Sequence, residues 1–215
     1  MPRSRSKAIK QPRRGMYIVC EGARDHSEYA YLNGFLQKTG LKIPSLKLVL
    51  SSKNNPVGLV NDIIKERETS EDILWVVFDN DNHADLDDAI QLAKVNGVNV
   101  ALSAISFEVW IYLHFDCTTR LFNKSEEVIK AIKSRFGYDY KKDNKRIFSE
   151  VGEKIDKAYK NAEFLRKDRT KNCTCVAKHH WNPYTNFDQL LEAVKNFVQE
   201  ETDGKKTFVD YDLPY

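Results

Sequence analysis

Cysteine and long apolar runs are both scarce in this 215-residue sequence. The four cysteines, at positions 20, 117, 173 and 175, are too few and too irregularly spaced for a disulfide framework, so we expect free thiols. No uninterrupted apolar run approaches the roughly 18 residues that cross a bilayer, and no apolar signal core follows the basic start. We therefore expect a cytoplasmic protein with no membrane partner.

Acidic residues are missing from the first part of the chain. Lysine and arginine total 34 against 31 acids, so the net charge of +3 alone says little about binding partners. Residues 1–14, however, carry basic residues at six positions and no acid, which predicts a basic flexible arm. Three interpretations stay open: a solvated tail, an arm that contacts phosphates through Arg13 and Arg14, and a transit peptide.

Strand-like and helix-like segments alternate through the first half of the sequence. Hydrophobic residues make up 41% and charged residues 30%, which suits a packed soluble fold. Short apolar runs predict strands, and apolar residues at helical spacing between them predict helices. This alternation predicts an α/β domain with a mainly parallel sheet flanked by helices. The predicted strands are 16–20, 45–50, 73–78 and 98–102, and the predicted helices are 26–38, a segment from 55 through 64, and 86–95.

The second half of the sequence is mainly helical in pattern. An aromatic-rich segment, 106–115, predicts a buried helix beside the sheet, and further helices are expected around 128–132, 151–165 and 190–197. We divide the chain into the basic arm 1–14, an α/β core 15–120, a helical portion 121–200 packed on that core, and a tail 201–215. The oligomeric state stays open, a homo-oligomer included.

Acidic residues directly follow two of the predicted strands. Glu21 follows the first, and Asp79 and Asp81 follow the most hydrophobic run in the chain. The carboxyl ends of parallel strands gather at one edge of a sheet, where ligands bind, so these side chains should be neighbours. Carboxylates are the ligands that Mg²⁺ or Mn²⁺ uses in phosphodiester chemistry. Glu21 could either ligate the metal or move a proton as general acid or base.

Three other features have two interpretations each. Glu108 lies in an apolar stretch and fits either the acidic site or a structural salt bridge. His114 favours a buried, hydrogen-bonded role over a catalytic one. The cluster of Cys173, Cys175, His179 and His180 offers zinc ligands, but its spacing matches no common finger and favours a polar loop that could border substrate.

A basic surplus lies between positions 141 and 171, with eleven basic residues against six acids. It is interpreted as a groove that draws a nucleic-acid backbone toward the acidic site, or as a solvated helix face with paired charges. We favour the groove, and name Lys141, Lys142, Lys145 and Arg146 as its candidate contacts. Tyr159 and Phe164 are expected in the core before they are expected to stack on bases.

An ordered set of short motifs resembles the RloB-like proteins, a family of the Toprim superfamily. The motifs are IVCEG at 18–22, SEY at 27–29, VFDND at 77–81, SFEVW at 106–110 with LHF at 113–115, and NPYTN at 182–186. The resemblance implies a Toprim-like Rossmannoid domain whose acidic metal site carries over to Glu21, Asp79 and Asp81. Glu28 matches a second acidic position, although the gap after Gly22 is longer than in the family pattern. It also implies a role in bacterial defence against phage beside an ABC- or AAA-type ATPase.

These observations predict a metal-dependent nuclease that needs no organic cofactor. The expected substrate is RNA, with tRNA among the candidates, or DNA, and the activity would be released by the ATPase partner. Two alternatives stay open: a noncatalytic adaptor with a degenerate Toprim fold that binds nucleic acid or the ATPase, and a primase-like nucleotidyltransferase that uses the same carboxylates.

Overall fold

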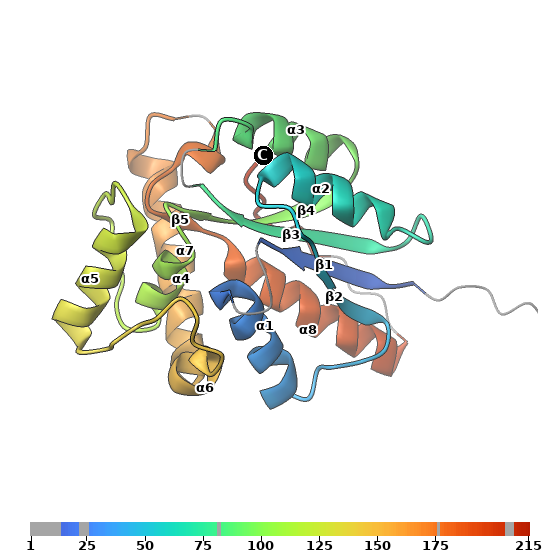
Figure 1. Cartoon of the computed structure of the whole chain (residues 1–215), viewed down its shortest axis with the longest axis horizontal. Helices are drawn as coiled ribbons and strands as arrows, with labels where there is room; N and C mark the ends of the chain where they lie inside the picture. The colour runs from blue at the N-terminus through green and yellow to red at the C-terminus, as the bar shows by residue number, and fades with distance from the viewer. Residues whose placement is uncertain (1–13, 22–25, 81–82, 176, 205–208) are drawn as a thin grey trace, which may run out of the picture.

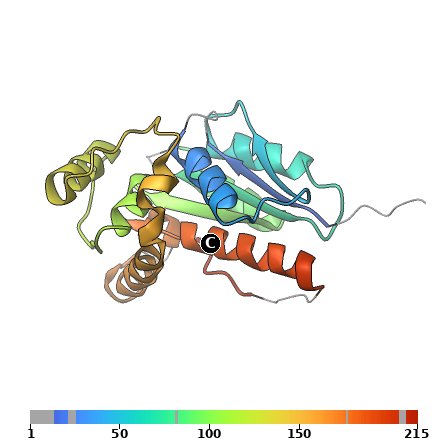
Figure 2. The same ribbon diagram turned by 90° about the horizontal axis from the view of Figure 1, so that it is seen from below.

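The computed structural model describes residues 14–21, 26–80, 83–175, 177–204 and 209–215. The described strands form one sheet in the order β2-β1-β3-β4-β5, in which β1 to β4 are parallel and β5 is antiparallel to β4. Figures 1 and 2 show the parallel strands running toward the end of the molecule where α5 lies. The strands are β1 Met16–Cys20, β2 Leu46–Leu50, β3 Ile73–Asp79, β4 Val98–Ala104 and β5 Tyr184–Thr185.

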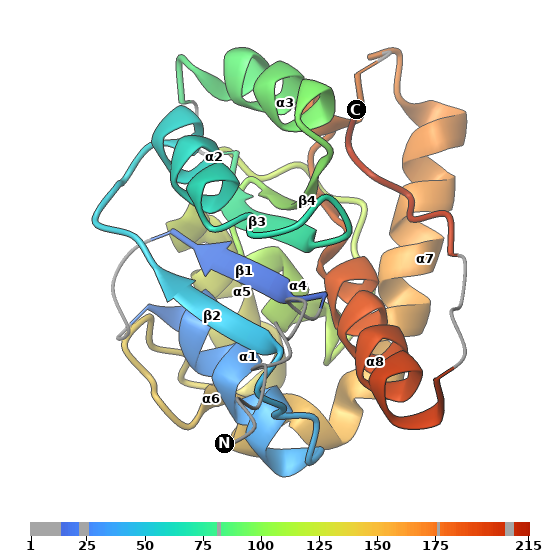
Figure 3. The same cartoon turned by 90° about the vertical axis from the view of Figure 1, so that its right-hand side faces the viewer.

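Helices cover both faces of the sheet, with α2 and α3 on one face and α1 and α8 on the other (Figures 1 and 3). Successive side chains of a strand point to opposite faces. Ile18 and Trp75 therefore pack in the core beneath α1 and α8, whereas Val19 and Val76 pack against α2 and α3. The helices that flank the sheet are α1 Ser27–Lys38, α2 Pro56–Lys65, α3 Leu86–Val95 and α8 Phe187–Asp203.

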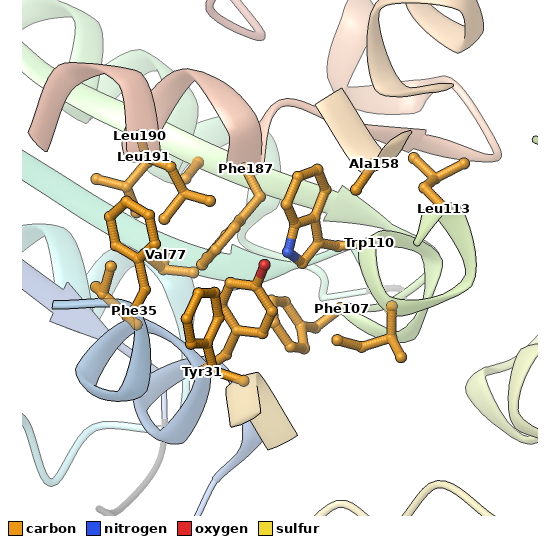
Figure 4. Packing of buried hydrophobic residues seen from close by; sticks show 14 of the residues in the cluster. Tyr31, Phe35, Val77, Phe107, Trp110, Leu113, Ala158, Phe187, Leu190 and Leu191 are labelled. Carbon is orange, nitrogen blue, oxygen red and sulfur yellow. The ribbon is translucent and has the colours of Figure 1, made fainter. Parts of the chain in front are cut away.

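The remaining helices surround the carboxyl side of the sheet. They are α4 Glu108–Leu113, α5 Ser125–Phe136, α6 Ile147–Val151, η1 Gly152–Lys154, α7 Ile155–Asn172 and η2 Lys178–His180. Tyr31 of α1 lies among the rings of Phe107, Trp110 and Phe187, with ring centroids 5.7 to 6.1 Å apart (Figure 4). This aromatic contact fixes α4 and the start of α8 against α1, and so positions the segment that carries Glu108.

The structure confirms the predicted α/β class and all four predicted strands of the parallel sheet. Local signals account for the start of α2: Asn55 caps it by accepting a 2.7 Å hydrogen bond from Gly58 N, and Pro56 fills its first turn. The four cysteines, all in the described part of the chain, are free, as expected. No helix in the described ranges is long and apolar enough to span a bilayer.

Two predictions of local structure were wrong. The helix expected over 151–165 is α7, which begins later, at Ile155, and continues to Asn172, while residues 147–154 before it form α6 and η1. Phe164 was expected in the core but is 56% exposed, since α7 turns that position to solvent. The short strand β5 was not predicted, because two residues carry no usable periodicity.

Candidate functional site

The candidate site lies where the order of the strands reverses. In the sheet, β2 is the neighbour of β1 on one side and β3 is its neighbour on the other side. The loop after β1 and the loop after β3 therefore leave the sheet toward opposite faces. Such switch points are where open α/β sheets bind ligands. Glu21 follows β1, and its backbone N–H donates a 3.0 Å hydrogen bond to Val77 O of β3. Asp79 ends β3 and is in register with Ser103 of β4.

A pocket of about 370 Å³ opens at this point, and carboxylates dominate its walls. Five of its eight lining residues are acidic, while Lys142 and His26 supply the basic groups. The pocket brings together Glu21 and Asp79, as the parallel topology predicted, and it adds the two secondary candidates Glu28 and Glu108. Asp81 lies outside the described residues. The complete lining is Glu21, His26, Ser27, Glu28, Asp79, Glu108, Lys142 and Asp143.

Four of the five carboxylates reach the pocket from the ends of four different elements. Glu28 lies in the first turn of α1, and Glu108 begins α4 with only 3% of its surface exposed. The backbone N–H of Phe107, the residue before α4, acts to lower the pKa of Asp79. Strand ends and helix starts therefore converge here, and the N–H groups at the start of α4 partly stabilise the negative charge.

Mutual repulsion and loss of solvent perturb these acids. Loss of solvation, followed by the charges of Glu28 and Glu108, raises the pKa of Asp79 well above its usual value. Loss of solvation, with the charges of Glu108 and Glu21, raises the pKa of Glu28 to about 7. Without a cation the pocket therefore retains protons that free carboxylic acids would lose at neutral pH.

Two basic side chains border the acids. Lys142 Nζ lies 3.7 Å from Glu108 Oε1, and His83 Nε2 lies 3.7 Å from Glu21 Oε1. The lysine side chain is 59% exposed, so water screens much of its attraction for Glu108. Lys142 therefore offsets only part of the negative charge of the pocket.

The donor set fits a divalent cation. Carboxylate oxygens are the ligands preferred by Mg²⁺ and Mn²⁺, and Glu21, Glu28, Asp79 and Glu108 all present them to one cavity. A bound cation would also lower these raised pKa values, since it favours the ionised form of each acid.

A family model described as RloB-like protein matches residues 16–194. The chain belongs to the RloB-like family. No curated protein and no solved structure matches it. The matched range contains Glu21, Glu28, Asp79 and Glu108, so the carboxylate pocket lies wholly within the part that this RloB-like protein shares with its family.

The predicted nucleic-acid contacts lie in different surroundings. Lys141, Lys145 and Arg146 are exposed on the segment that leads into α6, and Lys142 of the same segment reaches the pocket. Arg14 contacts α8 instead: its Nη1 lies 2.7 Å from Glu200 Oε2, and the guanidinium lies over the ring of Phe197. Arg13 lies outside the described residues. A role for these side chains in binding nucleic acid stays a prediction.

Part of the basic surplus between 141 and 171 is structural in this RloB-like protein. Arg166 is 6% exposed and binds Asp188 through two hydrogen bonds of 2.6 and 2.7 Å. Arg169 donates to the backbone oxygens of Asn182 and Thr119. These two arginines are committed to the fold, which reduces the charge available to a groove.

His114 is buried and hydrogen-bonded, as predicted. Its Nε2 lies 2.9 Å from Tyr31 OH and its Nδ1 3.0 Å from Trp110 O. Burial lowers the pKa of His114 to about 4, so the ring is neutral at physiological pH. The histidine supports the aromatic core and lies apart from the residues that line the pocket.

Sequence reasoning missed His26, Ser27 and Asp143 as lining residues. Ser27 Oγ donates a 2.7 Å hydrogen bond to Lys142 O, which fixes the segment after α5 against the start of α1. The sequence contains no local signal for this contact, because more than a hundred residues separate its two ends. For Glu108 the signal was present: a charge within an otherwise apolar stretch.

Proposed function

We propose that this RloB-like protein is a Toprim-type nuclease that uses Mg²⁺ or Mn²⁺ to hydrolyse phosphodiester bonds in RNA, tRNA included, or in DNA. The observation that carries the proposal is the convergence of Glu21, Glu28, Asp79 and Glu108 on one pocket at the switch point of the sheet. When bound, the cation would polarise the phosphoryl group and neutralise its charge. The protein contributes the carboxylates that hold it.

The pocket residues have separable roles in this proposal. Asp79, Glu21 and Glu108 hold the cation, and the raised pKa of Glu28, about 7, suits a group that gives or takes a proton near neutral pH. Lys142 is exposed at the rim beside Glu108 and can contact a substrate phosphate. Asp81 belongs to the same proposed set through the family resemblance.

Membership of the RloB-like family supports a role in bacterial defence against phage. In this proposal cleavage of nucleic acid halts phage replication or the host cell, and a neighbouring ABC- or AAA-type ATPase controls the nuclease.

The test is a cleavage assay with the purified full chain, alone and with the ATPase encoded beside it. The substrates are tRNA, single-stranded RNA and DNA, and plasmid, each with Mg²⁺ or Mn²⁺. Asp79→Asn and Glu21→Gln should lower the cleavage rate by at least about 100-fold, since each removes a cation ligand. Glu126→Gln, an exposed acid on α5, is the matched control and should cleave normally.

Two results would reject the nuclease. One is an inactive wild type with the ATPase present, and the other is normal cleavage by Asp79→Asn and Glu21→Gln. Either result would favour a noncatalytic adaptor.

A further inference from the structure

A second group of metal-ligand side chains lies outside the carboxylate pocket. Asp87, in the first turn of α3, and the consecutive His179 and His180 of η2 place one donor atom each within 4.8 Å of one another. His179 Nε2 lies 2.8 Å from Asp87 Oδ1, and His180 Nε2 lies 3.1 Å from the same oxygen. None of the three residues lines the carboxylate pocket.

The hydrogen bond on the far side of His179 determines which ring nitrogen carries the proton. His179 Nδ1 lies 3.1 Å from Pro214 O, and a carbonyl oxygen can only accept. The single proton of a neutral imidazole is therefore on Nδ1, and Nε2 presents a lone pair to the carboxylate of Asp87. Two acceptors at 2.8 Å repel unless a positive charge lies between them.

One metal ion can bind all three donor atoms of this arrangement. A second proton on His179 serves only the His179–Asp87 contact, and His180 then needs its own Nε2–H to donate to the same Asp87 oxygen. The imidazole centroids of His179 and His180 lie 4.4 Å apart, so two protonated rings would repel each other. A ring whose second nitrogen donates to a backbone carbonyl is the usual arrangement of a metal-bound histidine.

We propose that Asp87, His179 and His180 form a second metal site for a borderline transition-metal ion of the Zn²⁺ class. Imidazole nitrogens with one carboxylate suit Zn²⁺, in contrast to the all-oxygen donors of the carboxylate pocket. Asp87 and His180 are largely open to solvent, with side chains 70% and 47% exposed, so water can complete the coordination. His179, with its side chain 11% exposed, anchors the site to the fold.

The proposed site joins three segments that are distant in sequence. Asp87 belongs to α3, the histidines to η2, and Pro214 to the C-terminal segment, which lies beside α3 (Figures 1 and 3). Asn80 Nδ2 donates a 2.6 Å hydrogen bond to His179 O, so the residue after Asp79 contacts the same turn. Metal binding would therefore stiffen the segment next to the carboxylate pocket.

The site differs from the zinc cluster that the sequence suggested. Among the described residues, the group with coordinating distances contains Asp87 and omits Cys173 and Cys175. The cysteines precede η2 on the chain, and Cys175 contributes its backbone oxygen to Trp181 Nε1 at 2.9 Å. Asp87 could not be foreseen as the third ligand, because it lies on a helix ninety-two positions away from His179.

The test is a calorimetric titration of Zn²⁺ into the full chain after removal of metal with a chelator. With excess Mg²⁺ present to occupy the carboxylate pocket, wild type should bind one equivalent, and Asp87→Asn and His180→Ala should each bind at least about 100-fold more weakly, since each removes a ligand. Asp88→Asn, the adjacent exposed acid of α3, and Cys175→Ser are the matched controls and should bind normally. Co²⁺ in place of Zn²⁺ gives an absorption spectrum that reports nitrogen and oxygen ligands without assaying activity.

The doubly substituted Glu21→Gln, Asp79→Asn chain separates this site from the carboxylate pocket. It should bind Zn²⁺ as wild type does, whether or not the nuclease proposal holds. Both exposed-ligand variants should keep the wild-type circular dichroism spectrum, because neither removes a buried side chain. The proposal is overturned if wild type does not bind Zn²⁺ saturably, if Asp87→Asn binds normally, or if Cys175→Ser or the double variant loses binding.

Discussion

Ser27 Oγ lies 2.6 Å from Tyr140 OH, and this contact joins the start of α1 to the segment that carries Lys142. Ser27 donates its own hydrogen to Lys142 O, so the Tyr140 hydroxyl donates to Ser27. Both side chains are almost fully buried. A pair of neutral hydrogen bonds thus holds the basic rim of the pocket against its acidic wall.

Ser27→Ala should loosen this rim without removing a charge. It removes the buried hydrogen bonds that Ser27 makes with Tyr140 and with Lys142 O, which costs about 1–3 kcal/mol of unfolding free energy, measurable by urea denaturation. Substrate binding should weaken more than the catalytic rate falls, because only the Lys142 segment is displaced. Ser134→Ala, at an exposed position of α5, is the control and should change unfolding by less than about 0.5 kcal/mol. An unfolding free energy as high as that of the control would contradict this role.

The stability of the metal-free protein should depend on pH through Glu28. Its folded pKa, about 7, is raised from an ordinary value of 4.5, so the folded state binds the extra proton. The associated stability is complete below about pH 4.5 and is lost as the pH rises through about 7. The melting temperature of Glu28→Gln relative to wild type should therefore rise across this window, as followed by thermal unfolding at several pH values.

Mg²⁺ should reverse that loss in wild type. The cation requires ionised ligands, so the rise in melting temperature on adding Mg²⁺ should be larger above pH 7 than at pH 5. Glu126→Gln should show the wild-type behaviour at every pH. A melting-temperature difference between Glu28→Gln and wild type that stays constant from acidic to neutral pH would refute the assigned pKa shift.

Breaking the buried pair of Arg166 and Asp188 should destabilise the fold strongly. The side chains are 7% and 3% exposed, so Arg166→Met leaves a buried carboxylate without its main cation, at a cost of about 3–5 kcal/mol. The exposed pair of Lys167 and Glu163 lies on the same helix and is the matched control. Lys167→Met should cost less than about 1 kcal/mol in the same urea titration. Comparable losses in the two variants would show that Arg166 is not structural.

Lys142 and Lys141 should differ in nucleic-acid binding although they are adjacent and both exposed. Only Lys142 lines the pocket. The substitutions are made in a catalytically inactive Asp79→Asn chain. There, Lys142→Ala should weaken nucleic-acid binding and reduce the slope of log affinity against log salt concentration by about 1. Lys141→Ala should have a smaller effect on both quantities. An equal effect of the two substitutions would mean that the substrate passes over the segment without reaching the pocket.

The sequence predicted the features that depend on local pattern and on parallel topology. Glu21 and Asp79 could be placed together because each follows a buried strand, and parallel strands end at the same edge. Glu108 could be suspected because a charge in an apolar segment needs a partner. Family motifs added Glu28, which periodicity alone would have assigned to an ordinary helix surface.

Contacts between distant segments could not be predicted in the same way. The link from Ser27 to Tyr140 depends on how the segment after α5 folds back over α1, which no local propensity encodes. Arg166 has the same side chain as the exposed Arg146, and only burial beside Asp188 distinguishes its role. The position of Asp87 opposite His179 likewise follows from tertiary packing.

The central claim is that the carboxylates of the pocket hold one divalent cation. The direct measurement is a titration of Mn²⁺ into the full chain, with free Mn²⁺ followed by electron paramagnetic resonance. An Asp87→Asn background removes a ligand of the proposed second site. We predict that this chain binds one Mn²⁺ saturably. The binding should be lost in Asp79→Asn and in Glu108→Gln but kept in Glu126→Gln. Equal binding by all of these chains, or by none of them, would contradict the account.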